Sequence, residues 1–309
     1  MQPFRFAVQL SNASSGPAWR DLARRVEGLG YSTLFIPDHF EDQFGPLVAL
    51  TVAAEATTDL RVGSLVLGND YRHPVVLAKE VATLDLVSEG RVEFGLGAGW
   101  MTSDYRQAGI DEDPPAVRVD RLAESIAVLR SLWTDPVTTY EGEHYRITGA
   151  VGSPKPVQRP HPPIIIGGGG RRVLGIAGRE ADIVGVNPSL AAGHIGTEVI
   201  ATTAPEYYDR RLAWIREAAG DRFDRLELQC LTFMVQVVPD RAEAVGRLAQ
   251  LLSMDPALVA EAPVALIGTV DEMVADLRAR RDRWGFSYIV VHEAEMEAFA
   301  PVVAALAGT

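Results

Sequence analysis

Apolar residues are distributed along the chain in two alternating patterns. Short continuous runs are separated by longer stretches in which apolar residues recur every three or four positions. A continuous run is typical of a strand buried on both faces, and the longer spacing is typical of a helix with one buried face. The alternation therefore predicts a parallel sheet covered by helices. The predicted strands are residues 4–10, 33–36, 60–67, 92–96, 163–166, 181–186, 226–238 and 287–291.

Eight strands favour a closed (β/α)8 barrel, the TIM-barrel architecture, over an open sheet of five or six strands. Two stretches exceed a minimal barrel. Residues 137–148 are expected to form an inserted hairpin, and residues 240–268 a helical excursion. The sequence contains no linker or low-complexity tract, so residues 1–309 are expected to form a single α/β barrel domain with these insertions.

Composition narrows the possible functions. The 309 residues carry a formal net charge of -12, which argues against nucleic-acid binding because phosphate backbones require clustered Lys and Arg. Cys230 is the only cysteine, so neither an intrachain disulfide nor a thiolate metal site is expected. No apolar stretch reaches the ~18 residues of a membrane helix, and no signal peptide is recognisable. We expect a cytoplasmic protein without a metal or a membrane partner.

The second predicted strand ends in a polar pair, Asp38-His39. Taken alone, Asp38 would be interpreted as a helix N-cap. An adjacent histidine changes this interpretation, because functional residues of such barrels follow the strands and imidazole exchanges protons near neutral pH. His39 and Asp38 are therefore the candidate catalytic residues.

The fourth predicted strand runs into Gly97-Ala98-Gly99-Trp100. Alternating glycines allow a flat ligand to approach the backbone closely. The motif differs from the dinucleotide-binding fingerprint, because Trp100 occupies the position of its last glycine and the motif lies four strands into the chain. A planar ring beside Trp100 is the better physical interpretation.

The fifth predicted strand ends in four glycines, residues 167–170, followed by Arg171 and Arg172 at the start of a helix. Successive backbone N–H groups and a helix N-terminus favour a phosphate group, and the arginines strengthen this interpretation. No Lys-Ser or Lys-Thr pair follows the glycines, so a Walker-type site is excluded.

These motifs occur in the order found in luciferase-like monooxygenases, which the chain resembles over essentially its whole length. The resemblance rests on Asp-His, Gly-x-Gly-x-Gly-Trp, a helix with Arg118 and Glu124, and the glycine run. It is closest to the actinobacterial branch that depends on the deazaflavin coenzyme F420. The family implies a bacterial luciferase-like TIM barrel, a homodimer, and a flavin or deazaflavin cofactor.

The resemblance also implies roles for individual residues. Asp38 and His39 would flank the cofactor ring, and Leu65-Val66 would form a non-prolyl cis peptide against the ring's back face. The remaining expected cofactor-binding residues are Gly97, Ala98, Gly99 and Trp100 at the ring or ribityl chain, and Gly167, Gly168, Gly169, Gly170 and Arg171 at the phosphate.

The function implied is hydride transfer between C5 of F420 and a small organic substrate, with His39 donating or accepting a proton. One alternative is an FMN-dependent monooxygenase that receives reduced FMN from a partner flavin reductase. Another is a non-catalytic flavin- or deazaflavin-binding protein. Family members that oxidise glucose 6-phosphate carry an acidic residue in place of Trp100 and a tryptophan in place of Gln43, so that activity is not expected here.

Overall fold

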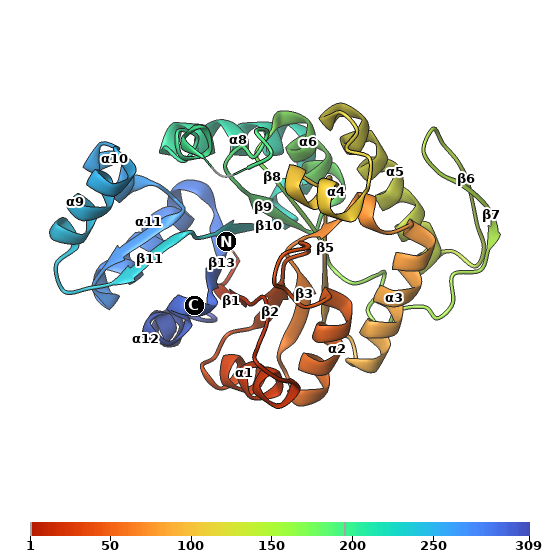
Figure 1. Cartoon of the computed structure of the whole chain (residues 1–309), viewed down its shortest axis with the longest axis horizontal. Helices are drawn as coiled ribbons and strands as arrows, with labels where there is room; N and C mark the ends of the chain where they lie inside the picture. Colours follow the sequence, from red (N-terminus) through yellow and green to blue (C-terminus); the bar gives the residue numbers. More distant parts are fainter. Residues whose placement is uncertain (1, 195) are drawn as a thin grey trace.

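A closed barrel of parallel strands forms the centre of the molecule (Figure 1). The computed structural model describes residues 2–194 and 196–309, and within them eight strands follow the order β3-β2-β1-β13-β10-β9-β8-β5, with pairing of β3 to β5 closing the ring. The predicted (β/α)8 barrel is thus confirmed. Its strands are β1 Arg5–Gln9, β2 Thr33–Ile36, β3 Arg61–Ser64, β5 Val92–Gly97, β8 Ile164–Gly168, β9 Ile183–Val186, β10 Glu227–Leu231 and β13 Phe286–His292.

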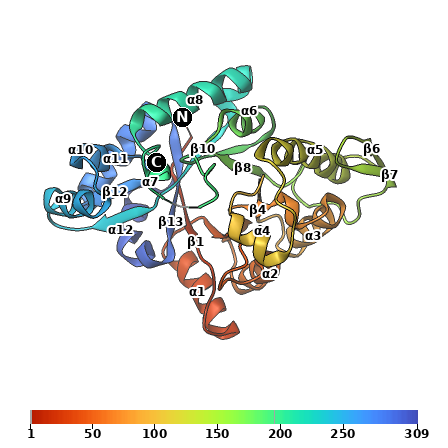
Figure 2. The same cartoon turned by 45° about the horizontal axis from the view of Figure 1, so that its top comes forward.

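Helices surround the barrel on its outer side (Figures 1 and 2). Several begin with proline in the first turn, where the missing N–H costs no hydrogen bond. In the described part of the chain, no helix is both long and apolar enough to cross a bilayer. The covering helices are α1 Gly16–Gly28, α2 Pro46–Ala56, α3 Pro74–Val87, α5 Pro115–Thr134, α6 Arg171–Glu180, α8 Pro205–Ala219, α11 Val270–Trp284 and α12 Met296–Leu306.

Both faces of the barrel strands are apolar, which explains their continuous apolar sequence. In β1, Phe6 and Val8 belong to the large core between strands and helices, whereas Ala7 belongs to a smaller cluster. Successive side chains of a strand point to opposite faces, so this smaller cluster fills the barrel interior. Its members are Ala7, Phe35, Ile165, Ile183, Tyr288 and Val290.

Charged side chains from the first residues of the strands form a network at the amino-terminal end of the barrel. Glu93, which is 1% exposed, accepts hydrogen bonds from Arg5 at 2.6 Å, Arg61 at 2.8 Å and the Tyr288 hydroxyl at 2.7 Å. Arg5 also donates to Glu227 at 2.9 Å. Burial alone would lower the pKa of Arg5, but the two carboxylates raise it above its ordinary value. The network closes this end of the barrel with paired charges.

An antiparallel hairpin precedes β8 and consists of β6 Thr138–Glu141 and β7 Arg146–Ala150. Its turn is held by Glu124 of α5, whose carboxylate accepts from the backbone N–H groups of Glu143, His144 and Tyr145 at 2.8, 3.0 and 3.1 Å. The glutamate noted in the sequence motif therefore fastens the hairpin to the helix.

Residues 226–238 were predicted as one strand, and this is wrong. β10 ends at Leu231, and the chain leaves the barrel as β11 Met234–Val237, which pairs in parallel with β12 Ala265–Gly268. Between the strands, the backbone N–H and hydroxyl of Thr232 both donate to the Val290 carbonyl, while the Phe233 N–H donates to Val264. The change of partner from β13 to β12 divides the strand.

The expected helical excursion at 240–268 contains α9 Arg241–Leu252 and α10 Pro256–Glu261, but its last four residues form β12. Two further short helices were not expected, α4 Thr102–Ala108 and α7 Thr197–Ile200. The third predicted strand also stops early, at Ser64, and resumes as β4 Leu67–Gly68 beside β5. These short elements surround the carboxyl end of the barrel.

Candidate functional site

Four predicted segments lie together at the carboxyl end of the barrel. β2, β3, β5 and β8 are consecutive neighbours in the ring. The segments that follow them carry Asp38-His39, Leu65-Val66, the glycines ending in Trp100, and the glycine run at 167–170. In parallel barrels, functional side chains occupy this end. The structure thus brings together at one mouth four segments that are far apart in sequence.

His39 is paired with a carboxylate that the sequence did not reveal. Its Nδ1 lies 2.7 Å from Oδ2 of Asp104, a side chain that is fully buried. An ionised carboxylate only accepts hydrogen bonds, so Nδ1 is the donor in this contact and Nε2 is the ring nitrogen left for a bound molecule. The His39 side chain remains 19% exposed, and it can therefore exchange a proton with a bound molecule.

Two further contacts hold Asp104 in place. The Phe40 backbone N–H donates to its Oδ1 at 3.2 Å, and the Tyr71 hydroxyl donates to its Oδ2 at 3.3 Å. Burial, together with the Asp104 carboxylate, raises the pKa of Tyr71 well above its ordinary value, so the phenol stays a donor. Asp104 can therefore orient His39 without itself moving.

Asp38 is bound by the protein itself. Arg72 donates two hydrogen bonds to its carboxylate, at 2.5 and 3.0 Å, and the Gly68 backbone N–H donates a third at 3.0 Å. A bidentate arginine and a backbone donor use the carboxylate's acceptors efficiently. Asp38 therefore fixes the loop that carries His39.

The peptide bond between Leu65 and Val66 is cis, as the resemblance implied. Gln9, the last residue of β1, donates from Nε2 to the Leu65 carbonyl oxygen at 2.8 Å. On the other side, a Cβ atom on Gly97 would lie 2.7 Å from Cγ2 of Val66. The glycine at position 97 is therefore required by Val66 as well as favourable for a flat ligand.

We expect Gly95→Ala to destabilise the protein by about 1 to 3 kcal/mol. An added Cβ would lie 2.0 Å from the Ser64 carbonyl oxygen, a backbone atom of the adjacent strand that cannot rotate away. The measurement is the midpoint of thermal unfolding. Gly170→Ala is the control, because a Cβ there meets nothing within 4 Å. Equal midpoints for the two variants would contradict the steric argument.

Trp100 borders both His39 and a cavity. Its ring meets that of His39 edge to face, with centroids 5.7 Å apart. A cavity of about 610 Å³ lies beside it and is lined by Glu41, Arg106 and His194 among others. The preceding Gly99 has φ +75°, and a Cβ there would lie 2.0 Å from the Tyr105 hydroxyl oxygen. His39 does not itself line this cavity, and Trp100 is the side chain that contacts both.

The glycine run forms the junction between β8 and α6. Side chains at Gly168 and Gly169 would collide with Val173 and with the Pro188 carbonyl oxygen, each at 2.3 Å. Gly170 is the N-cap of α6 and provides no side-chain hydrogen bond to its first turn. The loop therefore combines close backbone packing with free N–H groups, the arrangement that favours an anion.

The two arginines beside this loop lie on the outside. Arg171 is 68% exposed and contacts Glu217 at 3.3 Å. Arg172 contacts Asp120 and is 54% exposed. Instead, a buried arginine from α8, Arg211, reaches the loop and donates from Nε to the Gly169 carbonyl oxygen at 3.2 Å. Like Asp104, Arg211 was not recognised in the sequence.

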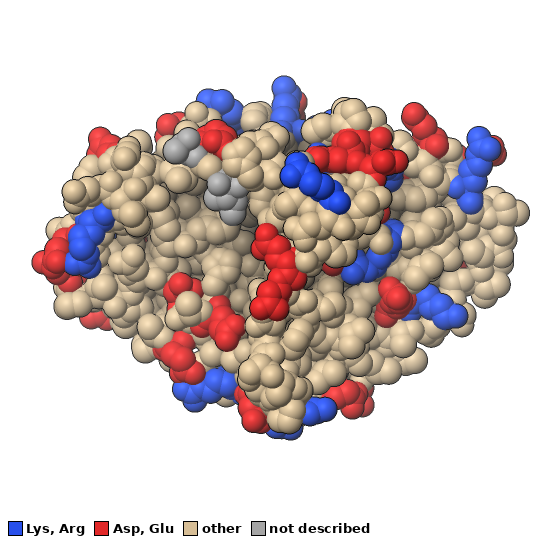
Figure 3. Space-filling view, viewed as in Figure 1, with Lys and Arg blue, Asp and Glu red and all other residues tan. Residues whose placement is uncertain are grey.

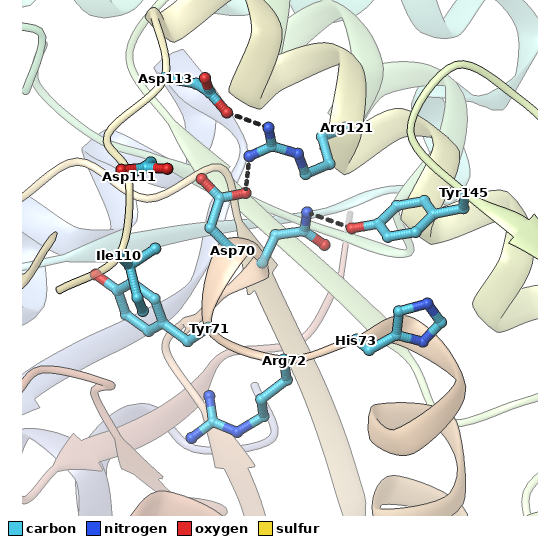
Figure 4. A pocket seen from close by; sticks show the side chains of 10 residues that line it. Asp70, Tyr71, Arg72, His73, Ile110, Asp111, Asp113, Arg121 and Tyr145 are labelled. Carbon is cyan, nitrogen blue, oxygen red and sulfur yellow. Dashed lines mark hydrogen bonds and ion pairs between the residues drawn. The ribbon is translucent and has the colours of Figure 1, made fainter. Parts of the chain in front are cut away.

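A second cavity, of about 390 Å³, lies between α5 and the turn η1 Asn69–Tyr71 (Figure 4). Two of its carboxylates share one arginine. Arg121 points between two carboxylates and donates to Asp70 at 2.8 Å and to Asp113. Asn69 donates to the Tyr145 hydroxyl at 3.3 Å. These contacts fasten η1, and with it the segment that carries Arg72, to helix α5.

On the face shown in Figure 3, acidic and basic side chains are interspersed, and acidic ones gather over the region where α4 and α5 lie in Figure 1. This distribution agrees with the net charge of -12.

Known proteins resemble this chain in sequence. An F420-dependent glucose-6-phosphate dehydrogenase of Nakamurella multipartita is 30% identical over 296 residues, 90% of this chain and 82% of the relative. An FMNH2-dependent dimethylsulfone monooxygenase of Pseudomonas putida is 29% identical over 201 residues, 59% of this chain and 55% of the relative. Alignments with several other curated relatives span 50% to 59% of their length.

A solved structure shares the fold. The coenzyme F420-dependent tetrahydromethanopterin reductase of Methanopyrus kandleri superposes with a TM-score of 0.75, at 20% identity, over 98% of both chains. The family model described as luciferase-like monooxygenase matches residues 1–286. With this match and the closed barrel, the chain belongs to the luciferase-like monooxygenase family.

Proposed function

We propose that the protein is an F420-dependent oxidoreductase that transfers a hydride between deazaflavin C5 and a small organic substrate. The observation that carries the proposal is the His39–Asp104 pair at the barrel mouth, which the Trp100 ring connects to the 610 Å³ cavity. A protein that only stores a cofactor needs no oriented, exchangeable proton at this place. The F420-dependent relative, aligned over 90% of the chain, supports the choice of cofactor.

The residues at the mouth fit a cofactor with a flat ring and a phosphate. The Leu65–Val66 segment and the glycines opposite offer a narrow backbone surface for the ring, beside Ala98 and Trp100. The open, uncapped start of α6 at Gly170 suits the phosphate. When bound, the deazaflavin supplies the site that gives or takes the hydride.

The protein's contribution is proton placement. Asp104 keeps the proton of His39 on Nδ1, so Nε2 is the atom that accepts a proton from a substrate hydroxyl during oxidation. In the reverse direction, the protonated imidazole returns it to a carbonyl oxygen. Arg72 and Asp38 hold the start of the His39 loop during both steps.

The second candidate is an FMN-dependent monooxygenase supplied with reduced FMN by a partner reductase. A specific observation favours it. F420 carries an acidic tail, which would be favoured by free cations at the mouth, but Arg72, Arg171 and Arg172 each contact a carboxylate. The FMN-dependent relative shows that the family also uses this cofactor.

Titration of the purified protein with F420 and, separately, with FMN tests the proposal. We expect F420 to quench tryptophan fluorescence at micromolar concentrations and FMN to bind far more weakly. Trp100 lies at the mouth, so Trp100→Phe should remove much of the fluorescence quench. Binding to this variant can still be followed by the absorbance of the cofactor. Preference for FMN would select the second candidate, and binding of neither would refute both.

A further inference from the structure

Arg211 is a buried positive charge that has no carboxylate partner in the part of the chain that the structure describes. The side chain belongs to α8 and the residue is 2% exposed. Its guanidinium donates from Nε to the Gly169 carbonyl at 3.2 Å and from Nη1 to the Thr202 carbonyl at 2.9 Å. Among residues 2–194 and 196–309, no carboxylate oxygen lies within 4.0 Å of it, and the two remaining residues are Met1 and Ile195.

Other deeply buried arginines differ in this respect. Arg118 and Arg280 are each 6% exposed, and each has a carboxylate nearby, Glu112 at 3.8 Å and Asp276 at 3.7 Å. Burial of a charge is costly unless an opposite charge compensates it. In keeping with this, burial lowers the pKa of Arg211, and the adjacent Tyr208 offsets the effect only in part. Within the described residues, Arg211 therefore has the Tyr207 and Tyr208 rings beside it but no carboxylate.

The position of Arg211 indicates where that anion binds. Gly169 lies one residue before the N-cap of α6, a helix of ten residues whose first turn has no side-chain cap. A Cβ on Gly170 would meet nothing within 4 Å, so space is open at this point. The exposed Arg171 and Arg172 are already paired with Glu217 and Asp120. Of these three arginines, Arg211 is the one without a carboxylate partner among the described residues.

We propose that Arg211 is the positioning residue that holds the glycine loop and compensates the charge of the cofactor's phosphate ester. The inference rests on the proposed function, since it assumes a phosphorylated flavin or deazaflavin. Nε fixes the Gly169 carbonyl, which directs the following N–H groups to the anion. The buried guanidinium adds a charge that raises affinity for phosphate and leaves affinity for the ring unchanged.

The test compares cofactors with and without the phosphate. Arg211→Gln should lower affinity for F420 and FMN by about 10- to 100-fold, while affinity for riboflavin and for the deazaflavin riboside without phosphate stays within a factor of three. Arg210→Gln removes the same charge one residue earlier, at an exposed position, and should change neither affinity. A merely structural Arg211 would weaken phosphorylated and unphosphorylated ligands equally, and that result would overturn the proposal.

A second measurement separates this inference from the identity of the cofactor. Inorganic phosphate, compared with chloride at equal ionic strength, should raise the unfolding temperature of the wild-type protein and of Arg210→Gln but not of Arg211→Gln. If F420 and FMN both fail to bind, the proposed function falls while this phosphate effect still supports Arg211. If Arg211→Gln does not fold, Arg211→Lys keeps the charge and loses the bond to Gly169, and it should retain part of the preference for phosphate. If phosphate raised the unfolding temperature of Arg211→Gln or Arg211→Lys as much as that of the wild type, the proposal would be overturned.

Discussion

Replacing His39 with alanine is expected to lower kcat by about 100-fold or more. The imidazole is the titratable group at the mouth that the structure both orients, through Asp104 at 2.7 Å, and leaves exposed. Its loss removes the proton donor or acceptor but leaves the glycine loop and the Leu65–Val66 segment intact. Cofactor affinity should therefore change by less than about threefold, as measured by titration beside steady-state kinetics. Unchanged turnover with intact cofactor binding would remove His39 from the mechanism.

His73→Asn is the matched control. His73 is also a histidine near the mouth, but its Nδ1 accepts from the Val75 N–H and caps helix α3. Asparagine is a good N-cap, so this variant should keep both stability and turnover. A comparable loss of turnover in His73→Asn would mean that the effect at position 39 is not specific to the site.

Asp104→Asn distinguishes orientation from proton transfer. An amide side chain can accept or donate, so it no longer fixes the proton on Nδ1 of His39. It also leaves the half-buried Tyr71 hydroxyl and the Phe40 N–H with a weaker acceptor. We expect kcat to fall by about 10-fold or more, with a displaced pH profile. If Asp104 merely packed the mouth, the variant would lower stability without moving the pH profile.

The barrel could be predicted because its strands are buried on both faces and are therefore continuous apolar runs. The same reasoning placed Asp38-His39 and both glycine motifs at one end, since parallel strands share a direction. It failed at 226–238, because a strand that leaves one sheet for another has the same apolar pattern as a single long strand. β12, with four residues, was likewise too short to recognise within a helical region.

The partners of the site residues could not be predicted. Asp104 is 65 residues from His39 and lies on a helix of seven residues, too short to show a helical period. Arg211 is one of several arginines on α8, and only its 2% exposure distinguishes it from the exposed Arg210. The sequence also could not show why Gly97 must be a glycine, because part of the reason is that Val66 packs against it. Such pairings depend on how distant segments pack.

The network at the opposite end of the barrel gives the largest expected effect on stability. We expect Glu93→Ala to lower the free energy of unfolding by about 3 kcal/mol or more, the lower end of the range for removing one partner of a buried ion pair. Glu93 is 1% exposed, and the change leaves Arg61 without its carboxylate and the Tyr288 hydroxyl without its acceptor. The lower end applies because Arg5 and Arg61 keep 26% and 27% of their side-chain exposure, which allows water to reach them. Urea unfolding measures the change.

Two variants show whether charge pairing is the cause. Glu93→Gln keeps the side-chain volume and an acceptor for Tyr288, so its free energy of unfolding should fall less than that of Glu93→Ala. It should still be clearly lower than that of the wild type, because Arg61 lacks a carboxylate. Glu243→Ala removes a glutamate from an exposed pair with Arg247 on α9 and should change stability by no more than about 0.5 kcal/mol. The network joins β1, β3, β5, β10 and β13 at the end of the barrel opposite the candidate site. Its loss should therefore affect the site only when the whole protein unfolds. Glu93→Ala with wild-type stability would show that the arginines find other partners and that the carboxylate is not what closes the barrel.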